Sequence, residues 1–146
     1  GNYVWEVPEG WLLSTAGSSM SLITFDVGDT PGKEAECYIV ELGGDGGGRL
    51  GNYNRWLGQF GQPPLEETEL MLQPPVIFFD EEVPMLVCEG SYTGMGETPK
   101  DDYMLLGASY EIDGKSLFIK LVGPKETVTS NWNKFLMFCA SIDVKS

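Results

Sequence analysis

Two stretches of the chain repeat their apolar residues every three or four positions, the spacing that gathers side chains on one face of a helix. The first stretch predicts a helix from about Leu50 to Phe60, directly after a run of glycines. The second predicts a terminal helix with Pro124 at its first turn. Its buried stripe consists of Val128, Trp132, Phe135, Cys139 and Ile142.

Alternating and continuous apolar runs predict strands elsewhere. A short edge strand broken by a proline is predicted over Trp5–Trp11, followed by a hairpin of Met20–Val27 and Glu36–Leu42. A short turn of helix is predicted near Glu66–Leu72. Four consecutive strands then follow: Val76–Phe79, Met85–Tyr92, Tyr103–Ile112 and Ser116–Val122.

The connections between these elements indicate how the strands pair. Asp113 and Gly114 between the last two strands are the strongest short signal for a hairpin. Tight connections imply antiparallel pairing, and the order strands, helix, strands, helix is typical of an α+β domain. The sequence therefore predicts one domain over residues 1–146, with an antiparallel sheet flanked by helices.

The glycine-dense loop from Gly43 to Gly51 is open to several interpretations. Gly46, Gly48 and Gly51 match the GxGxxG spacing of a dinucleotide site, but the Pro-rich segment after the helix does not supply the parallel strand that such a site needs. A P-loop is excluded because Arg49 stands where its lysine would be. We expect the loop, with Gly44, Gly46, Gly47 and Gly48, to shape the start of the helix or to let a partner backbone approach closely.

Charge narrows the set of partners. There are 9 Lys and Arg residues against 22 Asp and Glu, giving a net charge of −13 with no histidine. Phosphate backbones and anionic lipid would be repelled, so a basic protein partner is favoured over nucleic acid or a membrane surface. The apolar runs are too short to span a bilayer. The acidic clusters suit a solvated face, a basic partner or loose calcium binding, and they are Glu66, Glu67, Glu69, Asp80, Glu81, Glu82, Asp101 and Asp102.

Catalytic chemistry has little support in the sequence. Without histidine, the usual base for a serine or cysteine nucleophile is missing, and no zinc-ligand spacing is present. Cys37, Cys88 and Cys139 lie in apolar segments and are expected to be small buried residues, with one disulfide plus a free thiol as the alternative. We therefore expect no enzyme activity, no cofactor and no metal. The alternative is a carbohydrate- or nucleotide-binding enzyme that uses carboxylates or the glycine loop.

The polar side of the first helix is the candidate docking surface. Asn52, Asn54, Arg55 and Gln59 share that side, and Trp56 would serve as its anchor, because Trp and Arg dominate interface energetics. The competing structural interpretation is that Arg55 pairs with an acidic neighbour, that the Asn side chains cap the loop, and that Trp56 packs in the core. Three tyrosines are candidates to extend the surface: Tyr92, Tyr103 and Tyr110.

Several short motifs resemble the PsbP-like family of extrinsic photosystem proteins and related bacterial accessory proteins. They are Pro8, Gly10 and Trp11 near the start, Asn54, Arg55, Trp56 and Gln59 in the first helix, and Gly114, Leu117–Lys120, Gly123, Pro124, Phe135 and Ser141 towards the end. The resemblance covers most of the chain in order. It implies a PsbP-like α/β/α sandwich and a non-enzymatic accessory subunit in a thylakoid lumen or bacterial periplasm. The ion-binding residues of the photosystem members have no clear match here.

Together these observations predict an acidic accessory subunit that docks on a larger, membrane-associated complex of the cell envelope. The partner would be a protein subunit, with a role in assembly or stabilisation and, by the family resemblance, in photosynthesis. Export to a periplasm or lumen is expected from the resemblance and the acidity, whereas three unpaired cysteines favour the cytoplasm.

Overall fold

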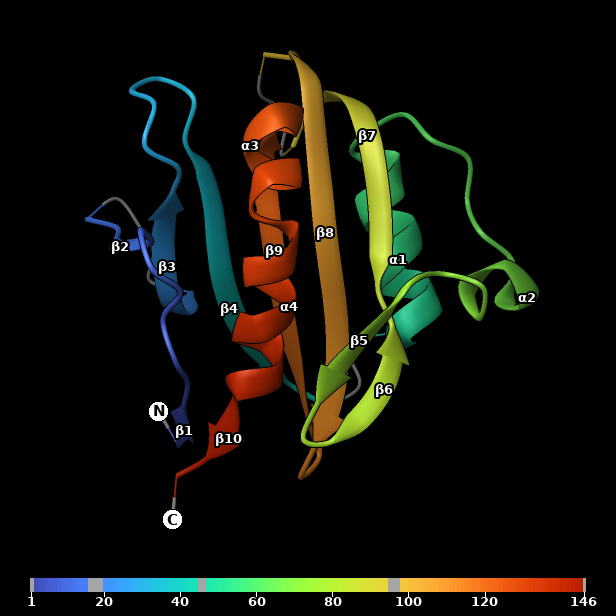
Figure 1. The fold of residues 1–146 in the computed structure, drawn as a ribbon. Coiled ribbons are helices and arrows are strands. Elements are labelled where there is room, and N and C mark those ends of the chain that lie inside the picture. The colour runs from blue at the N-terminus through green and yellow to red at the C-terminus, as the bar shows by residue number, and fades with distance from the viewer. Residues whose placement is uncertain (1, 16–19, 45–46, 95–97, 146) are drawn as a thin grey trace.

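The structure, a computed structural model, describes residues 2–15, 20–44, 47–94 and 98–145. It is an α+β fold in which one large antiparallel sheet carries helices on both faces (Figure 1). The predicted fold class is therefore confirmed.

Among the described residues, the central sheet has six strands in the order β2-β3-β4-β9-β8-β7, and each neighbouring pair is antiparallel. Asp113 and Gly114 form the predicted hairpin turn, and their φ values of 51° and 74° are those that a tight two-residue turn requires. The strands are β2 (Leu12–Leu13), β3 (Ser21–Val27), β4 (Ala35–Gly43), β7 (Leu86–Tyr92), β8 (Lys100–Ile112) and β9 (Lys115–Pro124).

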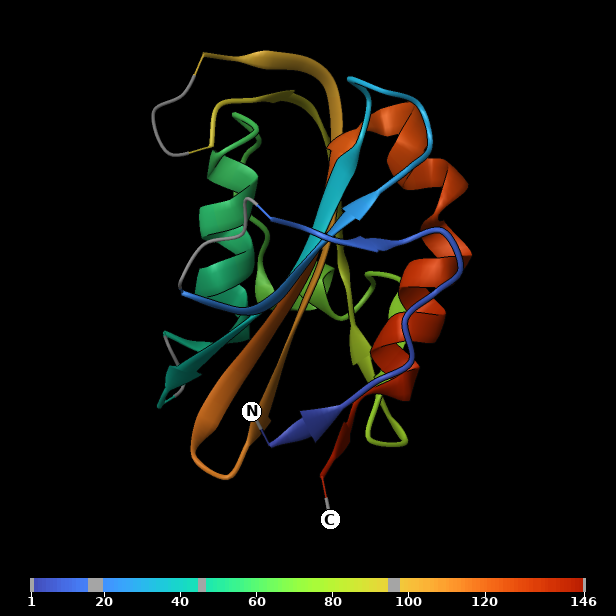
Figure 2. The same ribbon diagram turned by 90° about the vertical axis from the view of Figure 1, so that its left-hand side faces the viewer.

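The helices lie in two layers. In Figure 2, α1 (Gly48–Gly58) covers one face of the sheet, and α3 (Lys125–Ser130) and α4 (Trp132–Ser141) cover the other. The predicted terminal helix is thus two helices, because Asn131 leaves helical geometry with a φ of −108° and a ψ of 11°. Its side chain accepts a hydrogen bond from Nε1 of Trp11 at 3.1 Å and donates one to the carbonyl of Thr127 at 2.9 Å.

The edge strand predicted over Trp5–Trp11 is not formed, and the core beneath α3 and α4 explains why. Trp11 is buried there, with its ring 5.3 Å from Phe138 and 6.0 Å from Phe25. Residues 5–11 form no strand, and the amide of Trp11 instead closes a turn onto the carbonyl of Pro8 at 3.2 Å. The burial of the indole and this turn thus take the place of strand pairing in this segment.

A small hairpin of β5 (Pro75–Phe78) and β6 (Glu81–Pro84) packs on the α4 side of the sheet. The sequence predicts β5 but not β6, whose two acidic residues and proline hide the alternation. Phe78 is completely buried in the core under α4, which ties the hairpin to the sheet. The predicted helix after α1 is confirmed as the short α2 (Glu67–Leu70).

The two described ends of the chain pair with each other. β1 (Tyr3–Val4) and β10 (Asp143–Val144) form an antiparallel pair, and the amide of Lys145 donates to the carbonyl of Asn2 at 2.7 Å. Figures 1 and 2 place this pair at one end of the sheet, away from the β3–β4 turn.

A second core lies between α1 and the sheet. Trp56 of α1 lies directly over Gly107 of β8, where an added Cβ would be 2.8 Å from the indole. The hydroxyl of Tyr53 donates to the carbonyl of Pro84 and accepts from the amide of Ser109. These contacts hold α1 over β7, β8 and β9, so that β3 and β4 extend beyond it (Figure 2).

Candidate functional site

The first helix contributes less surface than the sequence predicts. Asn52 is 3% exposed; its amide donates to the carbonyl of Gly48 at 2.7 Å, and its Oδ1 accepts from Arg55 at 3.0 Å. Asn54 makes a pair of hydrogen bonds with the backbone of Leu65, at 2.7 and 3.1 Å. Both asparagines therefore bond the chain's own backbone, Asn52 inside α1 and Asn54 in the segment after it, and neither caps the start of the helix.

Trp56 is the clearest correction at the site. Its side chain is 1% exposed and packs between Tyr53, Phe118 and Gly107, so the prediction that it anchors a partner from the surface is wrong. The reason is that Gly107 leaves a space on the sheet that the indole fills. Gln59 is partly buried, and Arg55 remains exposed on α1.

The glycine loop has a local role at the start of α1. Gly44, Gly47 and Gly48 have φ values of 73°, 95° and 81°, which residues with a side chain rarely adopt, and nothing lies within 4 Å of where their Cβ atoms would be. The loop therefore needs glycine for its backbone conformation and not for close packing. Gly46 lies outside the described residues. Because β4 and its sheet neighbours are antiparallel, the βαβ unit of a dinucleotide site is not formed here.

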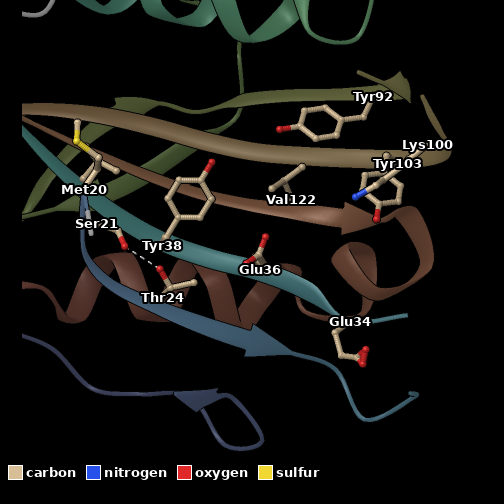
Figure 3. Close-up of a pocket in the computed structure, with 11 residues that line it drawn as sticks. Met20, Ser21, Thr24, Glu34, Glu36, Tyr38, Tyr92, Lys100, Tyr103 and Val122 are labelled. Carbon is tan, nitrogen blue, oxygen red and sulfur yellow. Dashed lines mark hydrogen bonds between the residues drawn. The ribbon is translucent and has the colours of Figure 1, made fainter. Parts of the chain in front are cut away.

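Beside α1, on the same face of the sheet, lies a groove of about 410 Å³, which we call the tyrosine groove. Its floor is formed by β3, β4 and β9, and β7 and β8 form its far wall (Figure 3). The lining residues are Met20, Ser21, Thr24, Glu34, Glu36, Tyr38, Val40, Tyr92, Lys100, Tyr103 and Val122.

Aromatic rings dominate the tyrosine groove. Tyr92 and Tyr103 stack with their ring centres 5.8 Å apart and their planes at 10°, and Tyr92 also packs against Phe60 at 5.0 Å. Tyr38 stands on the floor, and its hydroxyl and that of Tyr92 point into the same space (Figure 3). Burial is the main cause that raises the pKa of Tyr38, followed by its tyrosine and glutamate neighbours, so its hydroxyl stays protonated at neutral pH.

Two of the three tyrosines predicted to extend a surface thus meet in the groove. Tyr110 does not: it lies on the other side of the sheet, where it stacks on Phe79 and donates a hydrogen bond to Glu81.

Charged groups surround the rings. Glu34 and Glu36 are exposed along one side of the groove, and the ammonium of Lys100 lies 5.7 Å from the ring centre of Tyr103 (Figure 3). Next to Tyr38 on the same face of the sheet lies Lys120, whose ammonium is 4.9 Å from the ring centre of Trp56 and 5.4 Å from that of Tyr38. Burial and the nearby Arg55 charge lower the pKa of Lys120 to about 8, while Cys88 opposes the shift.

The three cysteine side chains lie in the two cores and do not line the tyrosine groove. The three cysteines are buried and unpaired, and burial raises the pKa of Cys88 to about 12, so a reactive thiolate is not formed at neutral pH. Within the described residues, no three Cys, Asp or Glu side chains are placed to hold a metal ion. The same part of the chain contains no helix long and apolar enough to cross a membrane.

The sequence alone did not show that Tyr38 and Lys120 lie side by side at a candidate binding site. The usable signal was alternation: Thr24, Tyr38 and Lys120 are polar positions between apolar neighbours on three separate strands. The register that places Tyr38 opposite Lys120 needs the β4–β9 pairing, which joins strands about eighty positions apart.

The comparisons with known proteins bear on the fold alone. The sequence matches no family model and no curated protein. Among solved structures, a protein from Bacteroides thetaiotaomicron VPI-5482, with a crystal structure at 1.50 Å resolution, aligns with a TM-score of 0.55 and 10% sequence identity. The alignment covers 99% of this chain and 46% of that one, so this chain spans about half the length of that protein. A similarity at this identity concerns the fold and carries no function.

Proposed function

We propose that this chain is a non-catalytic binding domain that docks on a larger assembly by taking a short segment of a partner protein into the tyrosine groove. The observation that supports this most is the groove of about 410 Å³ beside α1, which is lined by three tyrosine rings. A groove of that size holds a few side chains, and tyrosine is enriched at protein interfaces because it combines an apolar ring with a polar tip.

Charge favours a basic segment over other occupants. The protein has a net charge of −13, and Glu34 and Glu36 are exposed at the groove. A cationic partner would be attracted over distances of about 10 Å before contact, which raises the association rate. The resemblance to PsbP-like accessory proteins supports the same kind of role, and with it a place in the cell envelope or a lumen.

Site-specific photocrosslinking tests the proposal. We would place p-benzoylphenylalanine at Val40 in the groove, or at Met137 on the outer face of α4 as the matched control, in cells that make the protein. We expect Val40 to crosslink to one basic segment of one protein, while Met137, which is 68% exposed, does not. A synthetic peptide of that segment should bind the purified domain, and Tyr92→Ala should weaken it by ~2 kcal/mol or more, as for other hot-spot tyrosines.

The control for the peptide measurement is Tyr110→Ala, which removes a tyrosine outside the groove and should leave the affinity unchanged. Identical crosslinks from Val40 and Met137 would contradict docking at the groove. If the domain instead binds a member of a glycan panel and Tyr92→Ala abolishes that binding, the ligand is a carbohydrate and the docking proposal is wrong.

A further inference from the structure

Within the part of the chain that the structure describes, Lys120 has no anionic partner. Its ammonium contacts the rings of Trp56 and Tyr38, and among the described residues it makes no hydrogen bond or ion pair. A lysine placed in the middle of a sheet face normally reaches solvent or a carboxylate, because a buried ammonium without such a partner is costly.

A second cation lies beside it. Arg55 follows Asn54 and precedes Trp56 on α1, its guanidinium donates to Asn52, and its charge acts on both Lys120 and Tyr38. Its one hydrogen bond in the described part of the chain goes to Oδ1 of Asn52, an uncharged acceptor. Two of the protein's nine basic residues thus lie near each other, and neither makes an ion pair within the described residues, although the sequence contains 22 acidic residues.

We propose that Lys120 and Arg55 form an anion subsite beside the tyrosine groove, next to its residue Tyr38, that takes a carboxylate of the bound segment, an inference that rests on the function proposed above. A carboxylate fits better than a phosphate, because Glu36 also acts on Tyr38 and would repel a second negative charge. The rings of Tyr38 and Trp56 hold the ammonium in place, and Arg55 offers the planar donor pair that suits a carboxylate.

Such a carboxylate has two sources in a protein segment, its C-terminus or an Asp or Glu side chain. Three small probes distinguish them: acetyl-Tyr-Gly with a free C-terminus, acetyl-Tyr-Gly amide, and acetyl-Tyr-Asp amide. Binding is measured on the whole domain by NMR, from the lysine Hε–Cε and tyrosine ring resonances. The lysine resonances also report the pKa of Lys120 when the pH is varied.

We expect at least one carboxylate probe to bind about tenfold more tightly than the neutral amide, the factor typical of one charge-assisted hydrogen-bonded contact. The bound carboxylate should raise the pKa of Lys120 towards its ordinary value, since it stabilises the ammonium. The groups that face Lys120 in this titration are Arg55 from α1, Cys88 from β7 and Tyr38 from β4. Whichever carboxylate probe binds more tightly identifies the source.

Lys120→Met and Arg55→Gln should each remove the tighter binding of the carboxylate probe and leave the binding of the neutral amide unchanged. Lys125→Met, which changes an exposed lysine on α3, is the control and should not affect the binding of either probe. Equal binding of all three probes, with shifts confined to the tyrosine rings, overturns the anion subsite and leaves the groove as a docking site. Absence of binding by every probe at about 10 mM also overturns the subsite. The crosslinking result at Val40 then decides separately whether the groove binds a partner.

Discussion

Replacing Lys120 with methionine should stabilise the protein at neutral pH. Methionine keeps an unbranched apolar stem between Tyr38 and Trp56 and removes the charge. In the folded state the pKa of Lys120 is lowered from 10.5 to about 8, chiefly by burial and then by the Arg55 charge. At about 1.4 kcal/mol for each pKa unit, keeping the ammonium charged costs the fold about 3 kcal/mol. Loss of the two cation–π contacts offsets about 1 kcal/mol. The expected net gain for Lys120→Met is therefore about 2 kcal/mol.

The sign of the pH dependence follows from the same shift. Below pH 8 both the folded and the unfolded protein carry the proton, so the wild-type chain bears the whole penalty. Between pH 8 and 10.5 the unfolded state binds more protons than the folded state, and the stability of the wild type rises with pH. The advantage of Lys120→Met should then shrink and disappear near pH 10.5. Tyrosines that ionise in this range affect both proteins and largely cancel in the difference.

Urea unfolding of both proteins in steps from pH 6 to pH 10 measures this difference directly, provided that the dependence on urea concentration has the same slope in both. Lys125→Met is the control, because this half-exposed lysine makes only a surface ion pair with Glu89 at 2.8 Å, and its loss should change the free energy of unfolding by less than about 1 kcal/mol. A Lys120→Met protein that is less stable than wild type at pH 7, or a difference that does not vary with pH, would refute the reasoning.

Three further predictions concern packing. Gly107→Ala should destabilise the protein by about 1–3 kcal/mol, since its Cβ would meet the Trp56 indole at 2.8 Å, whereas Gly43→Ala, with open space around it, should be close to neutral in thermal unfolding. Trp56→Ala should lower the free energy of unfolding by about 3–5 kcal/mol, and a result below about 1 kcal/mol would contradict its place in the core. The three buried cysteines should not react with Ellman's reagent at pH 8 in the native protein and should all react in guanidinium; rapid labelling of any one without denaturant would contradict the burial described here.

The parts of the fold that could be predicted are those encoded over short distances. The apolar stripe of α1 and the Asp113–Gly114 turn each lie within one segment, so periodicity and turn chemistry were sufficient. Trp56 shows the limit of this approach. Its place on the helix is compatible with the core or with the surface, and Gly107, fifty positions away, decides between the two by leaving room for the indole.

The tyrosine groove was out of reach for a related reason. Its residues come from β3, β4, β7, β8 and β9, and a shift of one residue in any pairing would turn a strand's side chains to the opposite face. Tyr92 and Tyr103 could be named as surface aromatics, but their stacking depends on the β7–β8 register. The position of α1 beside the groove is a property of packing and has no local signal in the sequence.

The pairing of β1 with β10 has a topological consequence. Because Tyr3 lies opposite Val144, and the amide of Lys145 reaches the carbonyl of Asn2, anything attached at either end would leave from the same corner. That corner lies at the opposite end of the sheet from the β3–β4 turn and Glu34 (Figure 2). The domain could therefore be tethered at one point or inserted into a loop of another protein. Joining residues 2 and 145 would allow the chain to be opened elsewhere while every strand pair is kept.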